Sequence, residues 1–274
     1  MCLQFPNAEK LTTAEETILE YIESNYEEFL FMTIGEVAEK LSVSEATISR
    51  FARHLGCRDF KELKQSVNRQ KQTEGPVGKM AGTILKEEAL DELSYFVEQQ
   101  QYLVKTLEHL GSGNLERAVE AISQSGKIFI HAKNASVSMA QLLFFRLRRL
   151  GFETELLSGG SELLEGLSRA GQGDLVIFFS FSKLSYEAGI ILQEQKNAGY
   201  GTLAFTGRLH APAEELADIN LYVYRGSERE YHSMTAAAAL VDTIVVALMK
   251  RRGAEGAERL KKLHCLKKKY GRKK

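Results

Sequence analysis

The chain has 274 residues, of which 44% are hydrophobic, so it is long enough for two ordinary domains or one large domain and is not a disordered protein. Its 36 basic and 36 acidic residues give a formal net charge of zero, which hides an asymmetry along the chain. The 3 cysteines are isolated and form no CxxC pair, so they indicate neither disulfides nor zinc. We expect a cytoplasmic protein with no metal and no cofactor.

No segment has the pattern of a signal peptide or of a membrane span. Residues 1–13 lack a basic region followed by an apolar one. The most apolar long stretch, residues 234–249, contains Asp242 and is too short to cross a bilayer. We therefore expect no membrane contact.

Basic residues are concentrated in two segments. Seven Lys or Arg stand against two acidic residues from 46 to 72, and twelve stand against two from 250 to 274. Residues 9–39 are instead rich in Glu. This distribution predicts contact with a polyanion at the two basic segments and not elsewhere.

Residues 1–75 are predicted to form a domain of short helices. Three residues stand where an N-cap belongs, and the first two are followed three positions later by Glu, as in a capping box: Thr12, Thr33 and Ser44. Apolar residues recur behind them at helical spacing, in three groups: Ile18, Ile22 and Tyr26; Ile34, Val37, Ala38 and Leu41; Ile48, Phe51, Ala52 and Leu55. Only LSVS separates the second predicted helix from the third. This tight connection predicts a helix-turn-helix, in which one helix braces a second that enters the major groove of DNA.

Placing the apolar residues of the third helix inward turns a polar face outward. The members of this face are short or cationic: Ala46, Thr47, Ser49, Arg50, Arg53 and His54. Small side chains let a helix approach base edges, and arginine can pair with guanine or with phosphate. We predict that this face contacts DNA, together with three residues in the same basic region: Ser44, Lys61 and Lys64. The alternative is an ordinary solvated face of an amphipathic helix.

The stretch QTEGPVGKMAG combines Gly, Pro and polar residues and is the best boundary in the chain. We expect residues 76–110 to form a linker and a connecting helix from about Leu85 to Leu110. Strand-like and helical segments alternate over residues 111–252, with strands expected at 127–132, 152–157, 174–180, 201–207 and 219–224. Continuous apolarity in LVIFF predicts a strand covered on both faces. The alternation predicts an α/β domain with a five-stranded parallel, doubly wound sheet.

The C-terminal part combines a buried helix with a basic tail. From Met234 to Met249 a core-facing stripe should close the second domain, with members Ala237, Leu240, Val241, Ile244 and Leu248. Residues 253–274 form the basic tail, which we expect to be frayed at its end. Such runs are usually solvated, and the alternative is a sequence-independent contact with DNA phosphates.

Serines follow two of the predicted strands at the points where helices begin. In FFSFSKLSYEAG, residues 178–189, three serines surround Lys183: Ser180, Ser182 and Ser185. The first strand is followed by AKNAS, which ends in Ser136. In such sheets ligands bind beyond the carboxyl ends of the strands. Hydroxyls, backbone N–H groups and a helix N-terminus together suit a phosphate, whereas the alternative is that these serines are ordinary N-caps.

These motifs also carry a family resemblance. The segment TIGEVAEKLSVSEATISRFARHLGCRDFKELKQSV resembles the DNA-binding half of the RpiR/MurR family of bacterial sugar-responsive regulators. The matching residues are Val43, Ser44, Ala46, Thr47, Arg50, Phe51, Leu55, Gly56, Phe60 and Lys64. Gly56 stands just past the end of a helix, where a positive φ is expected.

Residues 127–250 are similar to the SIS (sugar isomerase) domain that follows this helix-turn-helix in the family. Its phosphate loop matches SFSKLSYE at Ser180, Ser182, Ser185 and Glu187, and its first turn matches AKNAS at Ser136 alone. The resemblance therefore implies phosphate contacts at the four serines. Three residues stand where the family has glycine, and they leave open whether the site is altered but working or a structural remnant: Ala132, Asn134 and Lys183.

The resemblance implies a DNA-binding transcriptional regulator of sugar metabolism genes that is not an enzyme. It would form at least a homodimer, bind a double-stranded operator, and change its operator affinity when a phosphorylated sugar binds the SIS domain. One alternative is a degenerate SIS domain that serves only dimerisation. The other is a sugar-phosphate isomerase, whose acid and base candidates would be Glu162, Glu187, Glu230 and His232. His131, at a strand end, is expected to be a core or rim histidine.

Overall fold

The computed structural model describes residues 3–5, 11–70, 76–86, 92–228 and 230–270. Two compact units divide the chain, one formed by Met1–Tyr95 with Gly226–His232 and the other by Phe96–Arg225 with Ser233–Lys274. The predicted domain boundaries at residues 75, 110 and 252 stay predictions. No helix of the described residues is long and apolar enough to cross a membrane.

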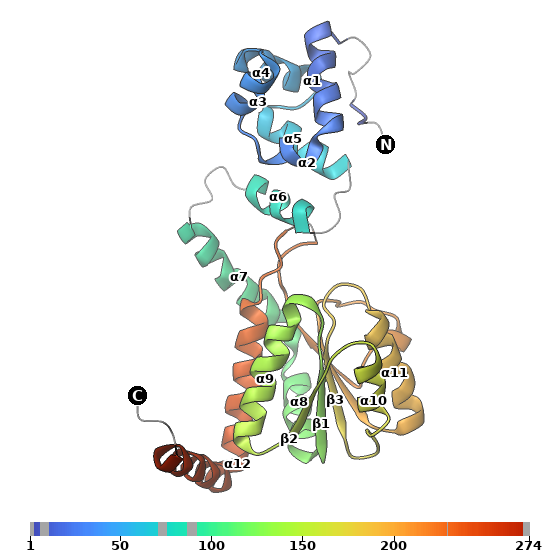
Figure 1. Ribbon diagram of the computed structural model, residues 1–274, viewed down its shortest axis with the longest axis vertical. Helices are drawn as coiled ribbons and strands as arrows, with labels where there is room; N and C mark the ends of the chain where they lie inside the picture. Colours follow the sequence, from blue (N-terminus) through green and yellow to red (C-terminus); the bar gives the residue numbers. More distant parts are fainter. Residues whose placement is uncertain (1–2, 6–10, 71–75, 87–91, 229, 271–274) are drawn as a thin grey trace. The chain divides into compact units, whose positions relative to one another are not determined.

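The first unit is helical (Figure 1). Its helices are α1 Thr13–Ser24, α2 Tyr26–Phe31, α3 Ile34–Leu41, α4 Glu45–His54, α5 Phe60–Gln70 and α6 Pro76–Lys86, followed by the start of α7 Glu92–Leu110. The predicted N-caps are confirmed: the side chains of Thr12, Thr33 and Ser44 each accept a hydrogen bond from the backbone N–H three residues later. The predicted capping boxes are complete, because Glu15 and Glu36 also accept from the cap residues.

Three helix assignments differ from the sequence prediction. Helix α1 ends before Asn25, so Tyr26 begins α2 instead of extending α1. Helix α5 was not predicted from the apolar spacing. Helix α6 lies inside the stretch predicted as a linker, because Pro76 is tolerated as the first helical residue.

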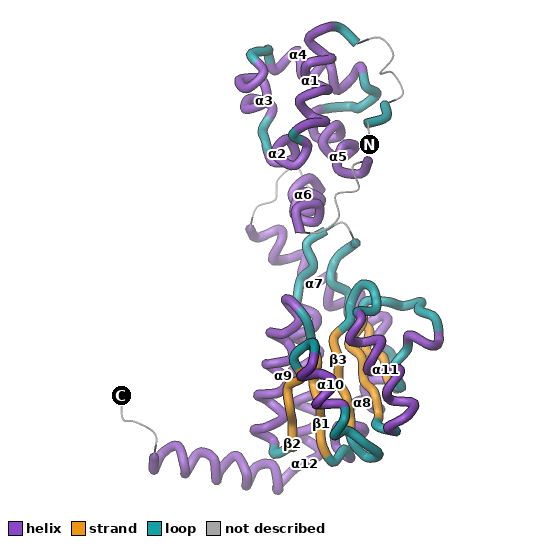
Figure 2. The backbone as a smooth tube through the Cα atoms, turned by 45° about the vertical axis from the view of Figure 1, so that its right-hand side comes forward, coloured by secondary structure: helices purple, strands orange, loops and turns teal. Residues whose placement is uncertain are grey.

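The second unit contains a five-stranded parallel sheet, as predicted (Figure 2). The strands are β1 Lys127–His131, β2 Glu153–Leu157, β3 Leu175–Phe179, β4 Gly201–Thr206 and β5 Ile219–Tyr222, in the spatial order β2-β1-β3-β4-β5. The helices are α8 Ser112–Gln124, α9 Val137–Leu150, α10 Ser161–Leu167, α11 Tyr186–Ala198 and α12 Thr235–Tyr270, with short 3₁₀ turns η2 Asn134–Ser136 and η3 Ala213–Glu215.

Helices cover both faces of the sheet (Figure 1). One face packs with α8, α9 and α12, and the other packs with α10 and α11. Every residue of β3 is buried, which confirms that this strand is covered on both sides. The strand order reverses between β1 and β3, so the carboxyl ends of these two strands form the topological switch point at which such folds bind ligands.

Helix α12 combines the predicted core stripe with an unexpected helical tail. All five predicted stripe residues are buried in the sheet core. The helix bends at Gly253, whose φ is 47°, and then continues to Tyr270. The predicted fraying concerns the end of the tail, which lies outside the described residues. Just before the bend, the guanidinium of Arg252 lies 4.0 Å from the ring centre of Phe152, and its Nη1 donates to the carbonyl of Leu150 at 3.0 Å.

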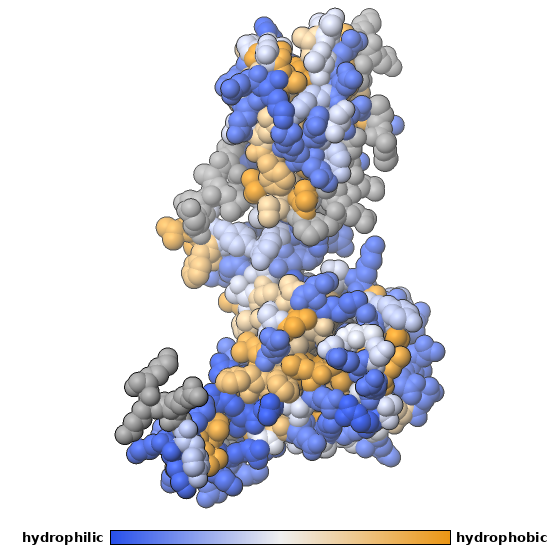
Figure 3. Space-filling view, viewed as in Figure 1, coloured by the Kyte–Doolittle hydropathy of each residue, from blue (hydrophilic) through white to orange (hydrophobic). Residues whose placement is uncertain are grey.

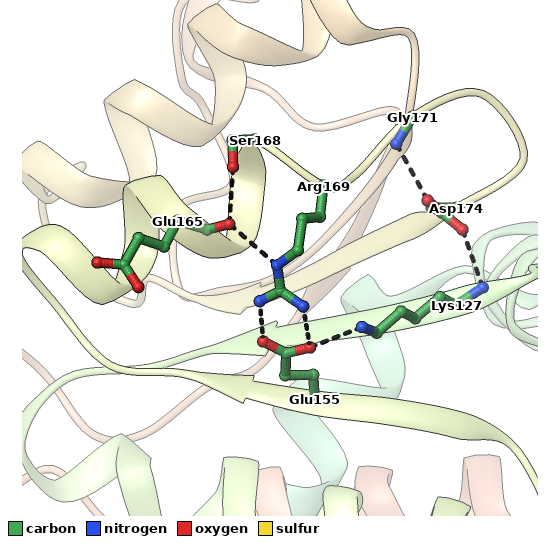
Figure 4. Close-up of polar contacts among 7 residues, drawn as sticks. All are labelled: Lys127, Glu155, Glu165, Ser168, Arg169, Gly171 and Asp174. Carbon is green, nitrogen blue, oxygen red and sulfur yellow. Dashed lines mark hydrogen bonds and ion pairs between the residues drawn. The ribbon is translucent and has the colours of Figure 1, made fainter.

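A charged network joins the starts of β1 and β3 to the middle of β2 (Figure 4). Both Nη atoms of Arg169 donate to the carboxylate of Glu155, and Nζ of Lys127 donates to the same carboxylate at 2.7 Å. Asp174 accepts from the backbone N–H of Lys127 at 2.9 Å and from that of Gly171 at 3.0 Å. The hydrogen bonds from Arg169 and Lys127 lower the pKa of Glu155 to about 2. Both carboxylates are therefore fully engaged in holding the strands together.

Candidate functional sites

Helices α3 and α4 form a helix-turn-helix whose turn is set by Ser42. This residue has a left-handed backbone, with φ 54° and ψ 38°, and so ends α3. The N–H of Val43 then returns to the carbonyl of Ala38 at 3.0 Å. Two residues after Ser42, Ser44 caps α4. The inner sides of both helices share one core, to which Val37, Ala38, Ile48, Phe51 and Ala52 contribute.

The outer face of α4 presents small and cationic side chains. Ala46, Arg50 and Arg53 are exposed, while Thr47 and Ser49 are partly exposed. Among the described residues, the guanidinium of Arg50 makes one long hydrogen bond, from Nη2 to Oγ1 of Thr47 at 3.4 Å. Ser44 is exposed, but its hydroxyl already accepts from the N–H of Thr47. The guanidinium groups of Arg50 and Arg53 can therefore approach a polyanion without breaking an ion pair with a described residue.

The predicted DNA-contacting residues at the edges of this face differ in availability. His54 is partly exposed, and its Nδ1 lies 2.9 Å from Oε1 of Glu15 on α1. Lys61 is partly exposed at the start of α5. Gly56 has the positive φ expected after α4, at 84°.

The prediction that Lys64 contacts DNA is wrong. Its side chain lies on the buried side of α5 between Leu63 and Val67 and is only 9% exposed. Nζ donates to the carbonyl of Met32, just after the end of α2, at 2.9 Å. Burial lowers the pKa of Lys64. Its ammonium group supports the helical core and is not available to a phosphate.

In the second unit, the predicted serine turns follow the two strands at the switch point. Strands β1 and β3 pair side by side, with His131 opposite Phe178, so the turns that follow them leave the same edge of the sheet. Ser136 is buried at the start of α9, and its side chain makes no capping hydrogen bond. Ser180 is buried, and its hydroxyl donates to the carbonyl of Lys183 at 3.2 Å.

The remaining residues of the second turn are more open. Ser182 and Lys183 are exposed. Ser185 is the N-cap of α11 and accepts from the N–H of Ala188 at 3.2 Å, as the N-cap alternative predicts. Its hydroxyl hydrogen is left to donate elsewhere, so capping and anion contact are compatible at this position.

The three residues that replace family glycines behave differently. Asn134 has a left-handed backbone, with φ 52°, which asparagine tolerates. Among the described residues that are not glycine, only Asn134 and Ser42 have positive φ, so neither Ala132 nor Lys183 is strained for lack of glycine. The exposed side chain of Lys183 also does not fill a buried space. The replacements thus leave the backbone of both turns unstrained.

A polar cluster beside the serine turns was not predicted from the sequence. Nζ of Lys133, in the turn after β1, lies 2.8 Å from Oε1 of Glu187 in the first turn of α11. His131, the last residue of β1, is buried, and its Nδ1 lies 3.0 Å from the carbonyl oxygen of Leu157 at the end of β2. The ion pair ties the turn after β1 to the helix after β3. No local pattern marks it, because its partners are 54 positions apart.

The proposed acid and base candidates are divided between the two units. Glu230 and His232 belong to the first unit, where Glu230 accepts from the N–H of Ser227 at 3.2 Å and His232 lies 3.0 Å from Nζ of Lys79. Glu162 is exposed in the first turn of α10. Of the four candidates, Glu187 lies beside Lys133 at the switch point.

Comparisons with known proteins agree with this architecture. Residues 6–74 match the helix-turn-helix domain of the rpiR family, and residues 121–249 match the SIS domain. An uncharacterised HTH-type transcriptional regulator from Caldanaerobacter subterraneus subsp. tengcongensis is 26% identical over 244 residues, which cover 87% of this chain and 84% of that protein.

Two solved structures share the fold. The sugar isomerase domain of an RpiR transcription factor from Sphaerobacter thermophilus has a TM-score of 0.60 and 24% identity, over 64% of this chain and 98% of that one. The Vibrio vulnificus NanR protein, complexed with ManNAc-6P, has a TM-score of 0.58 and 21% identity, over 96% of this chain and 95% of that one. The chain therefore belongs to the RpiR family of transcriptional regulators, with a helix-turn-helix domain followed by a SIS domain.

Proposed function

We propose that this regulator binds a double-stranded operator through α4 and that a phosphorylated sugar at the β1–β3 switch point changes its operator affinity. The observation that carries the proposal is the 2.8 Å ion pair between Lys133 and Glu187, because it joins the two serine turns at one edge of the sheet. Serine hydroxyls, backbone N–H groups and the N-terminus of α11 suit a phosphate there. The structurally similar NanR protein was solved with ManNAc-6P, a phosphorylated sugar.

Operator recognition requires at least a dimer, because one recognition helix reads too few base pairs. Exposed apolar side chains support self-association (Figure 3). They recur at helical spacing along α7, at Leu93, Phe96, Val97, Val104 and Leu107. Phe145 adds an apolar side chain on α9 and is 50% exposed. Surfaces of this kind are typical of protein interfaces.

The serine turn after β3 contacts a residue next to the segment of the chain that leads to the first unit. Between Ser180 and Ser182, the ring of Phe181 lies 4.3 Å from the guanidinium of Arg225. Arg225 and Ser233 flank the segment Gly226–His232 and form two hydrogen bonds with each other, a pair that we call the neck. Nε of Arg225 donates to the carbonyl of Ser233 at 3.1 Å, and the N–H of Ser233 donates to the carbonyl of Arg225 at 2.9 Å.

The segment that leaves this neck, Gly226–His232, belongs to the first unit. There the N–H of Tyr231 donates to Oγ1 of Thr83 on α6 at 2.6 Å. A ligand that displaces Phe181 would therefore move a segment anchored on α6. For this to change operator affinity, the ligand must bind two arrangements of the protein differently.

A binding role fits the switch-point residues better than isomerase catalysis. A base that takes a proton from carbon works best with a pKa near the operating pH. The hydrogen bond from Lys133 lowers the pKa of Glu187, and burial lowers the pKa of His131. A lowered pKa makes each group a weaker base, which favours a role in binding over proton abstraction.

Fluorescence anisotropy with a labelled DNA fragment from upstream of the chain's own gene tests the proposal. Titrations with and without a panel of sugar phosphates should give operator affinities that differ by about 5-fold to 150-fold for the active ligand, the usual range of allosteric coupling. The Arg225→Ala variant should bind DNA and ligand but show a smaller difference. Operator binding that ignores every sugar phosphate would instead favour a SIS domain used only for dimerisation.

A further inference from the structure

Two buried hydrogen-bond acceptors at the switch point have no donor among the described residues. They are Nε2 of His131 and Oε2 of Glu187. His131 is 2% exposed, and the side chain of Glu187 is 12% exposed. Native proteins rarely leave buried polar atoms unpaired, so such a pair beside a binding edge points to a ligand that completes it.

The tautomer of His131 follows from its other nitrogen. Nδ1 lies 3.0 Å from the carbonyl oxygen of Leu157, which can only accept, so Nδ1 carries the hydrogen. Burial lowers the pKa of His131 and keeps the ring neutral at neutral pH. Nε2 is therefore a lone-pair acceptor.

Glu187 presents a second acceptor of the same kind. Lys133 occupies Oε1 at 2.8 Å and lowers the pKa of Glu187, so the carboxylate is ionised and Oε2 can only accept. A Cβ added at Gly159 would lie 3.6 Å from Oε1 of Glu187, which places the turn after β2 at the same carboxylate. The turns after β1 and β2 and the first turn of α11 therefore meet here.

The chemistry of the cluster selects neutral donors. Lys133 neutralises the carboxylate and repels a metal cation. No group of three or more His, Cys, Asp or Glu arranged for a metal occurs among the described residues. An apolar group would leave both acceptors unpaired, whereas the hydroxyl groups of a sugar are neutral donors carried on adjacent carbons.

We propose that Nε2 of His131 and Oε2 of Glu187 each accept a hydrogen bond from a hydroxyl group of the bound sugar phosphate, so that they select its hydroxylated part while the serine turns hold its phosphate. This inference rests on the proposed function, which supplies the phosphate site. A site built to pair a hydroxyl discriminates strongly against an analogue that lacks it, because its own polar groups are then left unpaired.

Isothermal titration calorimetry on the full chain tests this division of roles. The probes are a panel of pentose, hexose and N-acetylhexosamine phosphates and, as hydroxyl-free comparisons, butyl phosphate and inorganic phosphate. His131→Asn keeps a donor for the carbonyl of Leu157 but has no atom at Nε2. Glu187→Gln keeps the shape of the side chain and removes its charge. Glu162→Gln, exposed in the first turn of α10, is the control.

The affinity for the tightest sugar phosphate should fall about 10-fold in His131→Asn and about 10-fold to 100-fold in Glu187→Gln, the range for losing a neutral or a charge-assisted hydrogen bond. Binding of butyl phosphate and inorganic phosphate should stay within about twofold in His131→Asn, a change too small to represent a lost hydrogen bond. Glu187→Gln also loses its ion pair with Lys133, so for this variant the expected result is a larger loss of affinity for the sugar phosphate than for butyl phosphate. The Glu162→Gln control should match the unmodified chain with every probe. Thermal unfolding of each variant checks that it is folded, and either variant alone gives the readout if the other does not fold.

Three outcomes would contradict the inference, and they separate it from the proposed function. Unchanged sugar phosphate affinity in the variants would overturn the inference alone and leave a bound water as the partner of the two acceptors. Equal losses for sugar phosphate and butyl phosphate would overturn it by showing a general structural role. No binding of any sugar phosphate by the unmodified chain would overturn both.

Discussion

Helices α4 and α5 are consecutive and both carry basic side chains, but they use them in opposite ways. Arg50 and Arg53 on α4 are exposed, and no hydrogen bond or ion pair joins the side chain of Arg53 to another described residue. Lys64 on α5 is buried and already donates to the carbonyl of Met32. A basic residue is thus available to DNA only where its charge is not needed by the fold.

The sheet shows the same contrast between its two ends. The carboxylate of Glu155 has donors on both oxygens, from Arg169 and Lys127 (Figure 4). The carboxylate of Glu187 has a donor on Oε1 alone. Closed clusters of this kind stabilise a fold, whereas open ones are candidate binding groups. Substitutions that affect stability and binding separately can test this distinction.

The largest effect is expected from Lys64→Ala. The substitution removes a buried stem and leaves the carbonyl of Met32 without its donor, so the free energy of unfolding should fall by about 2–3 kcal/mol. Lys64→Met keeps the stem and should cost less. Denaturant unfolding measures both, with the partly exposed Lys61→Ala as the control. A fully stable Lys64→Ala variant with weakened DNA binding would return Lys64 to the operator interface.

Arg50→Ala should show the reverse pattern. Operator affinity should fall by about 1–3 kcal/mol if the guanidinium contacts a base. The free energy of unfolding should change by no more than about 0.5 kcal/mol, because the side chain is exposed. Arg69→Ala removes the same charge from an exposed position in the last turn of α5 and is the matched control. Equal affinity losses in both variants would mean that only overall charge matters.

Local sequence patterns predicted much of this fold, and the prediction failed where a residue depends on a partner that is distant in the sequence. The N-caps at Thr12, Thr33 and Ser44 depend on residues three positions away, so the sequence revealed them. The five strands were predicted from apolar runs, and their parallel direction was predicted from the alternation with helices. The burial of Lys64 could not be predicted in this way, because its partner Met32 is 32 positions away and any exposed basic helix has the same composition.

The candidate site was predicted only in part for the same reason. Ser136 and Ser180 were placed at one edge of the sheet, because strand ends and helix starts are local signals. The ion pair between Lys133 and Glu187 depends on β1 lying beside β3 and on the exact path of two turns. His131 gave no signal, since a buried strand-end histidine is usually a core residue, and only its unpaired Nε2 distinguishes it.

The smallest effect is expected at the closed network, where Glu155→Gln should remove a pH-dependent contribution to stability. The folded-state pKa of Glu155 is lowered from 4.5 to about 2, so its contribution is present above about pH 4.5 and is lost as the pH falls through about 2. Because Glu155 and its partners Arg169 and Lys127 are partly exposed to solvent, we expect the charge of Glu155 to contribute about 1 kcal/mol to the free energy of unfolding at pH 7. Unfolding curves of Glu155→Gln and the unmodified chain should therefore converge between pH 5 and pH 2. A constant difference across this range would mean that the network contributes through packing and not through charge.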